Sequence, residues 1–193
     1  LAYEFSVVLP LLAAGPLDGG VGAYGLLTSA MGAGAIVGGL IVAARGRTGL
    51  GPLSGAAAAF GLAILLVAVS PTLPVAVAAM VVVGGTSVLF LSTGNATLQL
   101  KAAPPMRGRV MALWAMAFVG STPIGAPIIG FVSQQVSPRG GLVVGAIACL
   151  IAAAIGHRAA RRIDRRRPRK GPARPAAQVH PLPADGRLRP SPR

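Results

Sequence analysis

Acidic residues, histidine and cysteine are scarce in this chain of 193 residues, which has four Asp and Glu, two His and one Cys. Cys149 lies in an apolar run and has no second cysteine with which to form a disulfide or a structural zinc site. Of the two histidines, His180 lies near the C-terminus, which leaves His157 alone in the apolar part. These shortages argue against a histidine-based catalytic triad and a multi-histidine metal site, so we expect neither an enzyme nor a bound cofactor or metal.

Charge of either sign is also sparse, at 11% of residues against about a quarter in an ordinary soluble domain. Hydrophobic residues make up 53% of the chain, and the mean hydropathy is +0.70. A chain this apolar could not cover its core with a polar surface, which predicts a membrane protein. The formal net charge of +14 is concentrated at one end, because 12 of the 18 Lys and Arg lie between Arg158 and Arg193.

Apolar runs near the length that a bilayer requires, about 20 residues, recur along the chain. Runs such as AVAAMVVVGG do not alternate polar and apolar residues as β-barrel strands would. The sequence therefore predicts an all-α, polytopic membrane bundle of six transmembrane helices in residues 1–160. The predicted spans are residues 1–14, 23–44, 52–69, 74–100, 110–133 and 142–156. The first is short and does not begin as a signal peptide does, and we expect it to be truncated in a chain that is a fragment.

Basic residues fall almost entirely on one side of this predicted topology. With six spans, 17 of the 18 Lys and Arg lie in the second connector, the fourth connector and the C-terminal region, and only Arg139 lies on the other side. By the positive-inside rule, loops rich in Lys and Arg stay in the cytoplasm, so we expect the C-terminus to be cytoplasmic. The chain is then a multi-pass protein of the cell membrane. The candidate cytoplasmic anchors are Arg45, Arg47, Lys101, Arg107 and Arg109.

Residues 161–193 are rich in Pro, Arg and Gly and lack hydrophobic periodicity, which predicts a disordered, basic cytoplasmic tail. Anionic lipid headgroups are its expected neighbours. Nucleic-acid binding is not predicted, since the tail has no aromatic residue on which a base could stack.

Three polar residues inside the predicted spans are candidates for a translocation path or for coupling: Glu4, Asn95 and Gln99. Glu4 lies ten residues before the end of the first span, about 15 Å, which is near the bilayer midplane. A charged carboxyl group there is costly, so Glu4 could exchange a proton in a wet cavity, or form a structural hydrogen bond. Asn95 and Gln99 are four residues apart on one helix face, where they could line a path, bond between helices or emerge at the interface.

The stretch GSTPIGAPIIG, residues 120–130, combines the composition of a loop with the setting of a charge-free span. Pro123 and Pro127 cannot donate the backbone hydrogen bonds of an α-helix, and both fall on one face. Because exposed irregular backbone is too costly in hydrocarbon, we predict a kinked helix rather than a loop. Gly125 and Gly130 would leave room for a neighbouring helix to pack closely against the kinked helix.

Gly34 and Gly38 form a G-x-x-x-G pattern in the second predicted span. Small residues four apart let helix backbones approach closely in lipid. The pattern fits packing within this chain, and it also fits a homodimer face.

Two stretches resemble a known transporter family. VVLPLLA with GAYGLLTSAMGAGAIVGG resembles spans seven and eight of major facilitator superfamily exporters, in the enterobactin-exporter-like or transmembrane secretion effector branch. GNATLQLKAAPPMRGRVMALWAMAFVGSTPIGAPIIG resembles spans ten and eleven of the same branch, and the likeness covers about residues 3–158. The loop ARGRTGLG lacks the acid of the family's Gly/Asp/Arg loop, which puts gating by this loop in doubt.

The resemblance implies a twelve-span transporter of which this chain is the C-terminal half and whose N-terminal half is missing here. It implies alternating access with a small-molecule substrate of drug or siderophore type, and efflux driven by protons. The alternative is a non-transporting membrane scaffold or a degenerate half-transporter.

Overall fold

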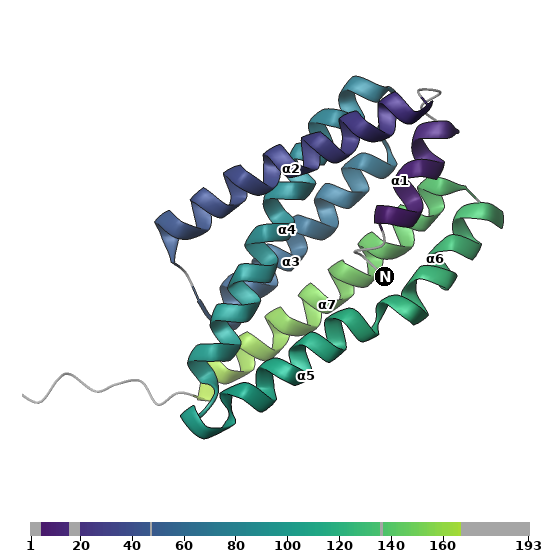
Figure 1. Cartoon of the computed structure of the whole chain (residues 1–193). Helices are drawn as coiled ribbons and strands as arrows, with labels where there is room; N and C mark the ends of the chain where they lie inside the picture. The colour runs from purple at the N-terminus through teal and green to yellow at the C-terminus, as the bar shows by residue number, and fades with distance from the viewer. Residues whose placement is uncertain (1–4, 16–19, 47, 136, 167–193) are drawn as a thin grey trace, which may run out of the picture.

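The computed structural model describes residues 5–15, 20–46, 48–135 and 137–166, and within these ranges it contains helices and no strand (Figure 1). The predicted all-α class is therefore confirmed for the described part of the chain. In order, the elements are α1 (Phe5–Ala14), α2 (Gly20–Arg45), α3 (Leu50–Ala68), α4 (Leu73–Lys101), the 3-10 turn η1 (Pro104–Met106), α5 (Arg107–Gly120), α6 (Thr122–Gln135) and α7 (Pro138–Arg166).

Five stretches among the described residues are long and apolar enough to cross a membrane: α2, α3, α4, the α5–α6 pair with η1, and α7. Helix α1 has only 10 described residues, fewer than a span requires. The predicted count of six spans is thus supported for five of them, and the first remains a prediction.

The last helix extends beyond the predicted boundary at residue 160. Helix α7 continues to Arg166, so the first six residues of the predicted tail are helical. Ala and Arg are good helix formers, and the first proline after residue 160 is Pro168. Composition alone assigned these residues to the tail, and helix propensity explains the difference. Residues 167–193 lie outside the described part of the chain.

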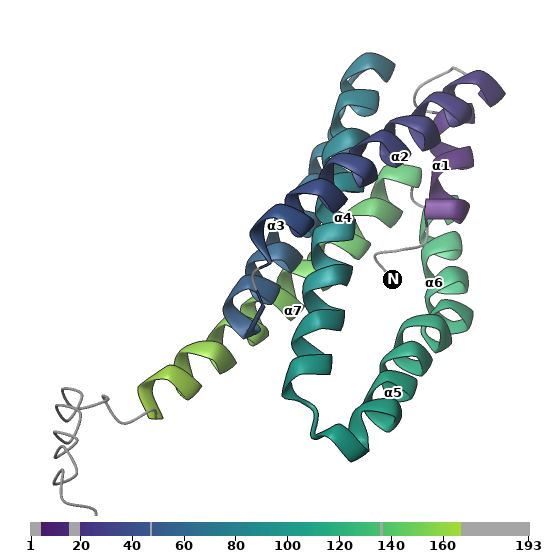
Figure 2. The same cartoon turned by 60° about the vertical axis from the view of Figure 1, so that its left-hand side comes forward.

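The bundle is built around two tightly packed helix pairs, α2 with α4 and α3 with α7, joined where α3 packs on α4 (Figures 1 and 2). Helix α1 lies between α2 and α6 and also contacts α7. At the centre, the buried ring of Phe60 on α3 stacks on Phe90 of α4 and meets Phe5 of α1 edge-on, both with centroids 6.3 Å away. These rings join three of the helices in a single core.

The glycines of the G-x-x-x-G pattern pack within the chain. Gly34 and Gly38 of α2 are buried, and a Cβ on either would collide with the α4 backbone, at Val81 and Gly85 respectively. Gly84 of α4 reciprocates, since a Cβ there would collide with the Met31 carbonyl of α2. Of the two interpretations that the pattern allowed, the structure shows intrachain packing of α2 on α4.

The predicted kink lies at Ser121, between α5 and α6, and Figure 2 shows the two helices meeting at an angle. Helix continues on both sides of Ser121, so the stretch is a bent helix and not a loop. Pro123 falls in the first turn of α6, where a missing N–H costs little, and Pro127 lies inside α6. The Ser121 hydroxyl donates to the Phe118 carbonyl oxygen at 2.9 Å, one turn back along α5.

Helices α6 and α7 form a hairpin in which Gly141 is required for close packing. A Cβ at Gly141 would collide with Ser133 Oγ and lie 3.4 Å from the Ile129 carbonyl oxygen. Ser133 is buried, and its Oγ has no hydrogen-bond partner among the described residues. The hydroxyl therefore adds a desolvation penalty as well as occupying the space beside Gly141.

This packing yields a first prediction. Gly141→Ala should destabilise the protein by about 2 kcal/mol through overpacking, whereas Ser133→Ala should be neutral or stabilising by up to about 1 kcal/mol. The double variant should regain most of the lost stability, as measured by thermal unfolding in detergent. A double variant as unstable as Gly141→Ala alone would contradict the steric explanation.

Candidate functional site

The ends of α2, α4 and α7 and the starts of α3 and α5 lie at one end of the bundle (Figure 1), and basic residues are concentrated in these segments. Of the candidate anchors, the structure places Arg45 at the end of α2, Lys101 at the end of α4, and Arg107 and Arg109 in the first turn of α5, all exposed. Arg47 lies outside the described residues. We call this the basic end; it also carries Arg158, Arg161 and Arg162 of α7.

At the opposite end, Arg139 is the one basic residue among those described. It lies in the first turn of α7, and its Nη2 donates to the Ser70 carbonyl oxygen at 2.9 Å, next to the C-terminus of α3. A cation suits this position because carbonyl groups accumulate partial negative charge at a helix C-terminus. Arg139 thus holds the α3–α4 connector against α7, and this structural contact accounts for the only charge at this end of the described bundle.

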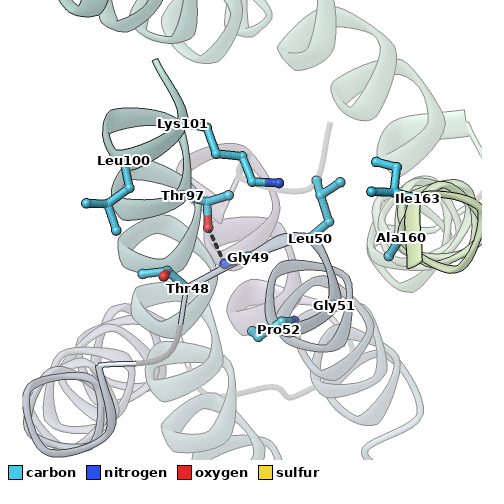
Figure 3. Close-up of a pocket in the computed structure, with 10 residues that line it drawn as sticks. All are labelled: Thr48, Gly49, Leu50, Gly51, Pro52, Thr97, Leu100, Lys101, Ala160 and Ile163. Carbon is cyan, nitrogen blue, oxygen red and sulfur yellow. Dashed lines mark hydrogen bonds between the residues drawn. The ribbon is translucent and has the colours of Figure 1, made fainter. Parts of the chain in front are cut away.

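A pocket of about 410 Å³ lies at the basic end, between the start of α3 and the ends of α4 and α7 (Figure 3). Its wall contains the Gly49 N–H, which donates to Thr97 Oγ1 of α4 at 2.9 Å. Figure 3 shows the Lys101 side chain extending across the pocket toward Leu50. The hydrogen bond fixes the α2–α3 connector to α4, and it gives Thr97 a structural role that the sequence did not indicate.

Asn95 and Gln99 lie on the last three turns of α4, before the basic end. Asn95 is half-buried, and its Oδ1 is enclosed with no hydrogen-bond partner among the described residues. Gln99 is exposed. The two therefore share a helix face that leads from the interior to the surface, and the Asn95 amide is available to a group that is not part of the described chain. Glu4 lies outside the described residues, so its predicted place near the midplane stays a prediction.

Next to Asn95, the only tryptophan of the chain packs on a glycine. A Cβ at Gly94 would lie 3.3 Å from Cζ2 and Cη2 of Trp114 and 3.6 Å from Leu53 Cδ1. Trp114 belongs to α5, of which no described residue is buried, so this contact is a principal attachment of α5 to α4. The sequence did not predict this contact, although it contains two signals for it: a single Trp in a chain with 4% aromatic residues, and a glycine inside a polar run.

Within the described residues, no group of three or more His, Cys, Asp or Glu could hold a metal ion. The polar groups that converge are amides, hydroxyls and basic side chains at one end of a helical bundle. Such groups can bind and release a solute, and among the described residues they do not assemble a nucleophile with a base.

Comparison with known proteins decides the family. A family model described as transmembrane secretion effector matches residues 2–173, which is most of the chain. The chain belongs to the transmembrane secretion effector family. This family is a branch of the major facilitator superfamily, as the sequence resemblance indicated. No curated protein and no solved structure shows significant similarity to this chain.

Membership of this family shows that the chain is a membrane transporter. The match runs through every described helix, so the bent span and the polar end of α4 both belong to the transporter body.

The bend between α5 and α6 gives a second prediction. Pro123 and Pro127 are both exposed, so replacing both by alanine removes little packing while it restores two helix hydrogen bonds. Pro123→Ala with Pro127→Ala should straighten the α5–α6 span and reduce transport severalfold more than it reduces the folded yield. The measurement is transport per folded molecule, with Ala126→Ser as a matched variant between the two positions. Normal transport by the double variant would show that the bend serves helix packing and is not needed for transport.

Proposed function

We propose that this chain is one half of a proton-coupled transporter that exports small molecules of drug or siderophore type by alternating access. The observation that carries the proposal is the Asn95 amide, whose enclosed Oδ1 finds no hydrogen-bond partner in the described part of the chain, on a helix face that reaches the surface at Gln99. An unpaired amide oxygen in an apolar bundle is costly, and such groups persist where a solute, water or a second helix supplies the missing donor.

A second six-helix half of the same transporter is part of this proposal. Alternating access in this superfamily uses two halves that rock around a shared site near the midplane. The exposed position of Gln99 and the absence of buried residues on α5 leave one side of the described bundle open to such a partner.

The proposed location is the cell membrane, with the basic end and the C-terminus in the cytoplasm. Its support is the distribution of charge, because the anchors Arg45, Lys101, Arg107 and Arg109 share one end and Arg139 is held at the other.

The test is transport by the full-length protein reconstituted in vesicles. The probes are ethidium, as a drug-like cation, and a catecholate siderophore, each followed with and without a pH gradient. Gradient-dependent movement of either probe is the expected result. If neither probe is transported, and adding them causes no proton flux, the alternative of a non-transporting scaffold is favoured.

A third prediction concerns coupling. Glu4→Gln should abolish gradient-driven efflux of the transported probe while it leaves exchange of that probe at equal pH intact, because an amide cannot carry the proton. The two assays are run on the same vesicles, so exchange serves as the control for folding. Undiminished gradient-driven efflux would rule out Glu4 as the coupling residue.

A further inference from the structure

A second cavity lies on the outer side of the α3–α7 pair, next to the basic end. It measures about 400 Å³ and is open at the side. Its walls are mostly small residues, among them Gly51, Gly55 and Ala58 on α3 and Ala154 on α7. A Cβ at Gly51 or Gly55 would meet nothing within 4 Å, so the space is due to the missing side chains. From residue 51 to residue 58 the groove is about 10 Å long.

The floor of the groove presents no free polar group. Gly156 of α7 lies close to α3 there, since a Cβ on it would be 3.4 Å from Ser54 Cβ. The Ser54 hydroxyl is buried and donates to the Gly51 carbonyl at 2.9 Å, so its hydrogen is already used. Leu150 and Ala153 complete the apolar lining. An apolar chain can therefore enter the groove without leaving a polar atom unpaired.

The end of the groove at the basic end carries a fixed guanidinium. His157 lines the cavity, and Arg161, one turn further along α7, donates from Nε to His157 Nε2 at 2.8 Å. This bond uses the Nε edge of the guanidinium and does not involve the two Nη groups. Two parallel N–H groups suit a phosphate oxygen pair, which an arginine binds in a bidentate manner.

Charge complementarity identifies the occupant. Arg158 and Arg162 flank Arg161, and the last turns of α7 carry five arginines, at positions 158, 161, 162, 165 and 166, against a single acid, Asp164. We propose that the α3–α7 groove binds an anionic phospholipid, with an acyl chain along Gly51, Gly55 and Ala58 and the phosphate on the Nη groups of Arg161. Along α7 the apolar groove comes first and Arg161 follows one turn after His157, so the groove would face the acyl chain and Arg161 the headgroup.

The test measures lipid retention by the purified full chain with native mass spectrometry. The probes are palmitoyl-oleoyl phosphatidylglycerol and, as the zwitterionic comparison, palmitoyl-oleoyl phosphatidylcholine. Arg161→Gln should lower retention of the anionic lipid by about fivefold, the effect of one basic residue near an anionic surface. Gly55→Leu fills the groove and should lower it at least as much.

Two matched variants make the result specific. Arg109→Gln removes an arginine from the same end but not from the groove, and Gly39→Leu makes the same substitution on α2, where a Cβ also meets nothing within 4 Å. Both should lose clearly less lipid than Arg161→Gln and Gly55→Leu.

Equal losses for the two arginine variants would overturn the proposal, and so would equal retention of the anionic and the zwitterionic lipid. So would a mass of two chains that disappears in Gly55→Leu, because a second copy would then occupy the groove. None of these outcomes depends on transport, so the proposed function stands or falls separately.

Discussion

Replacing Gly34 by alanine should remove most of the folded protein. The added Cβ would collide with the backbone of Val81 on α4, and a backbone cannot turn aside as the end of a flexible side chain can. Helix α2 would have to move away from α4 along the most extensive helix contact of the bundle. Overpacking against side chains costs about 1–3 kcal/mol, and a backbone collision should exceed that range. Such a loss is a large part of the roughly 5–15 kcal/mol that stabilises a typical domain.

The measurement for Gly34→Ala is the yield of monodisperse protein after extraction, together with its thermal unfolding. Gly39→Ala is the matched control, because it makes the same change five residues later on α2, where a Cβ meets nothing within 4 Å. Gly84→Ala should behave like Gly34→Ala, since it meets the Met31 carbonyl from the other side. Indistinguishable yields for Gly34→Ala and Gly39→Ala would mean that α2 and α4 are not in the described contact.

Asn95→Leu should separate transport from stability. Leucine branches at Cγ as asparagine does, and the amide oxygen that it removes has no hydrogen-bond partner among the described residues. Removing an unsatisfied buried acceptor is neutral or stabilising, so the unfolding temperature should hold or rise. If the amide meets the solute, transport should fall about tenfold or more, as expected when a polar site loses a group worth about 1.4 kcal/mol or more to the transported species. Transport per folded molecule and thermal unfolding are measured on the same preparation.

Thr86→Val is the control for Asn95→Leu. It removes a polar group from the same helix, but the Thr86 hydroxyl is already used within α4, where it donates to the Val82 carbonyl at 2.7 Å. Transport by Thr86→Val should match the unmodified protein. A loss of transport in both variants would indicate that α4 tolerates no polar-to-apolar change. A loss of stability in Asn95→Leu would show that the amide has a structural partner instead.

Much of the fold follows from hydropathy, because in a bilayer every long apolar stretch without charge must satisfy its backbone as a helix. The same rule predicted that residues 120–130 are a bent helix. The break lies at Ser121, and Pro123 falls in the first turn of α6. The rule did not predict this position, because it does not say at which residue the second helix begins. Gly34 and Gly38 indicated a close contact, but spacing along one helix cannot say that its partner is α4.

The candidate site was less accessible to prediction from the sequence. Polar residues in the span of residues 74–100 indicated which helix end to examine, and Asn95 and Gln99 share a face there as expected. The contact of Trp114 with Gly94 and the hydrogen bond from Gly49 to Thr97 each join residues on different helices or connectors. Periodicity reports the neighbours of a residue along its own helix, and such contacts depend on how the helices pack. The sequence therefore predicts that Asn95 and Gln99 share a helix face, but not which residues of other helices surround that face.

The break at Ser121 divides one span into two rods with different attachments. Helix α6 packs on α1 and α7, whereas α5 has no buried residue and meets α4 near Trp114. A rod of 14 residues is about 21 Å long, so a rotation of about 10° at the break would displace its tip by about 4 Å. Arg107 and Arg109 lie at that tip. The span thus has the geometry of a lever, with its fulcrum inside the membrane and its charged arm at the surface.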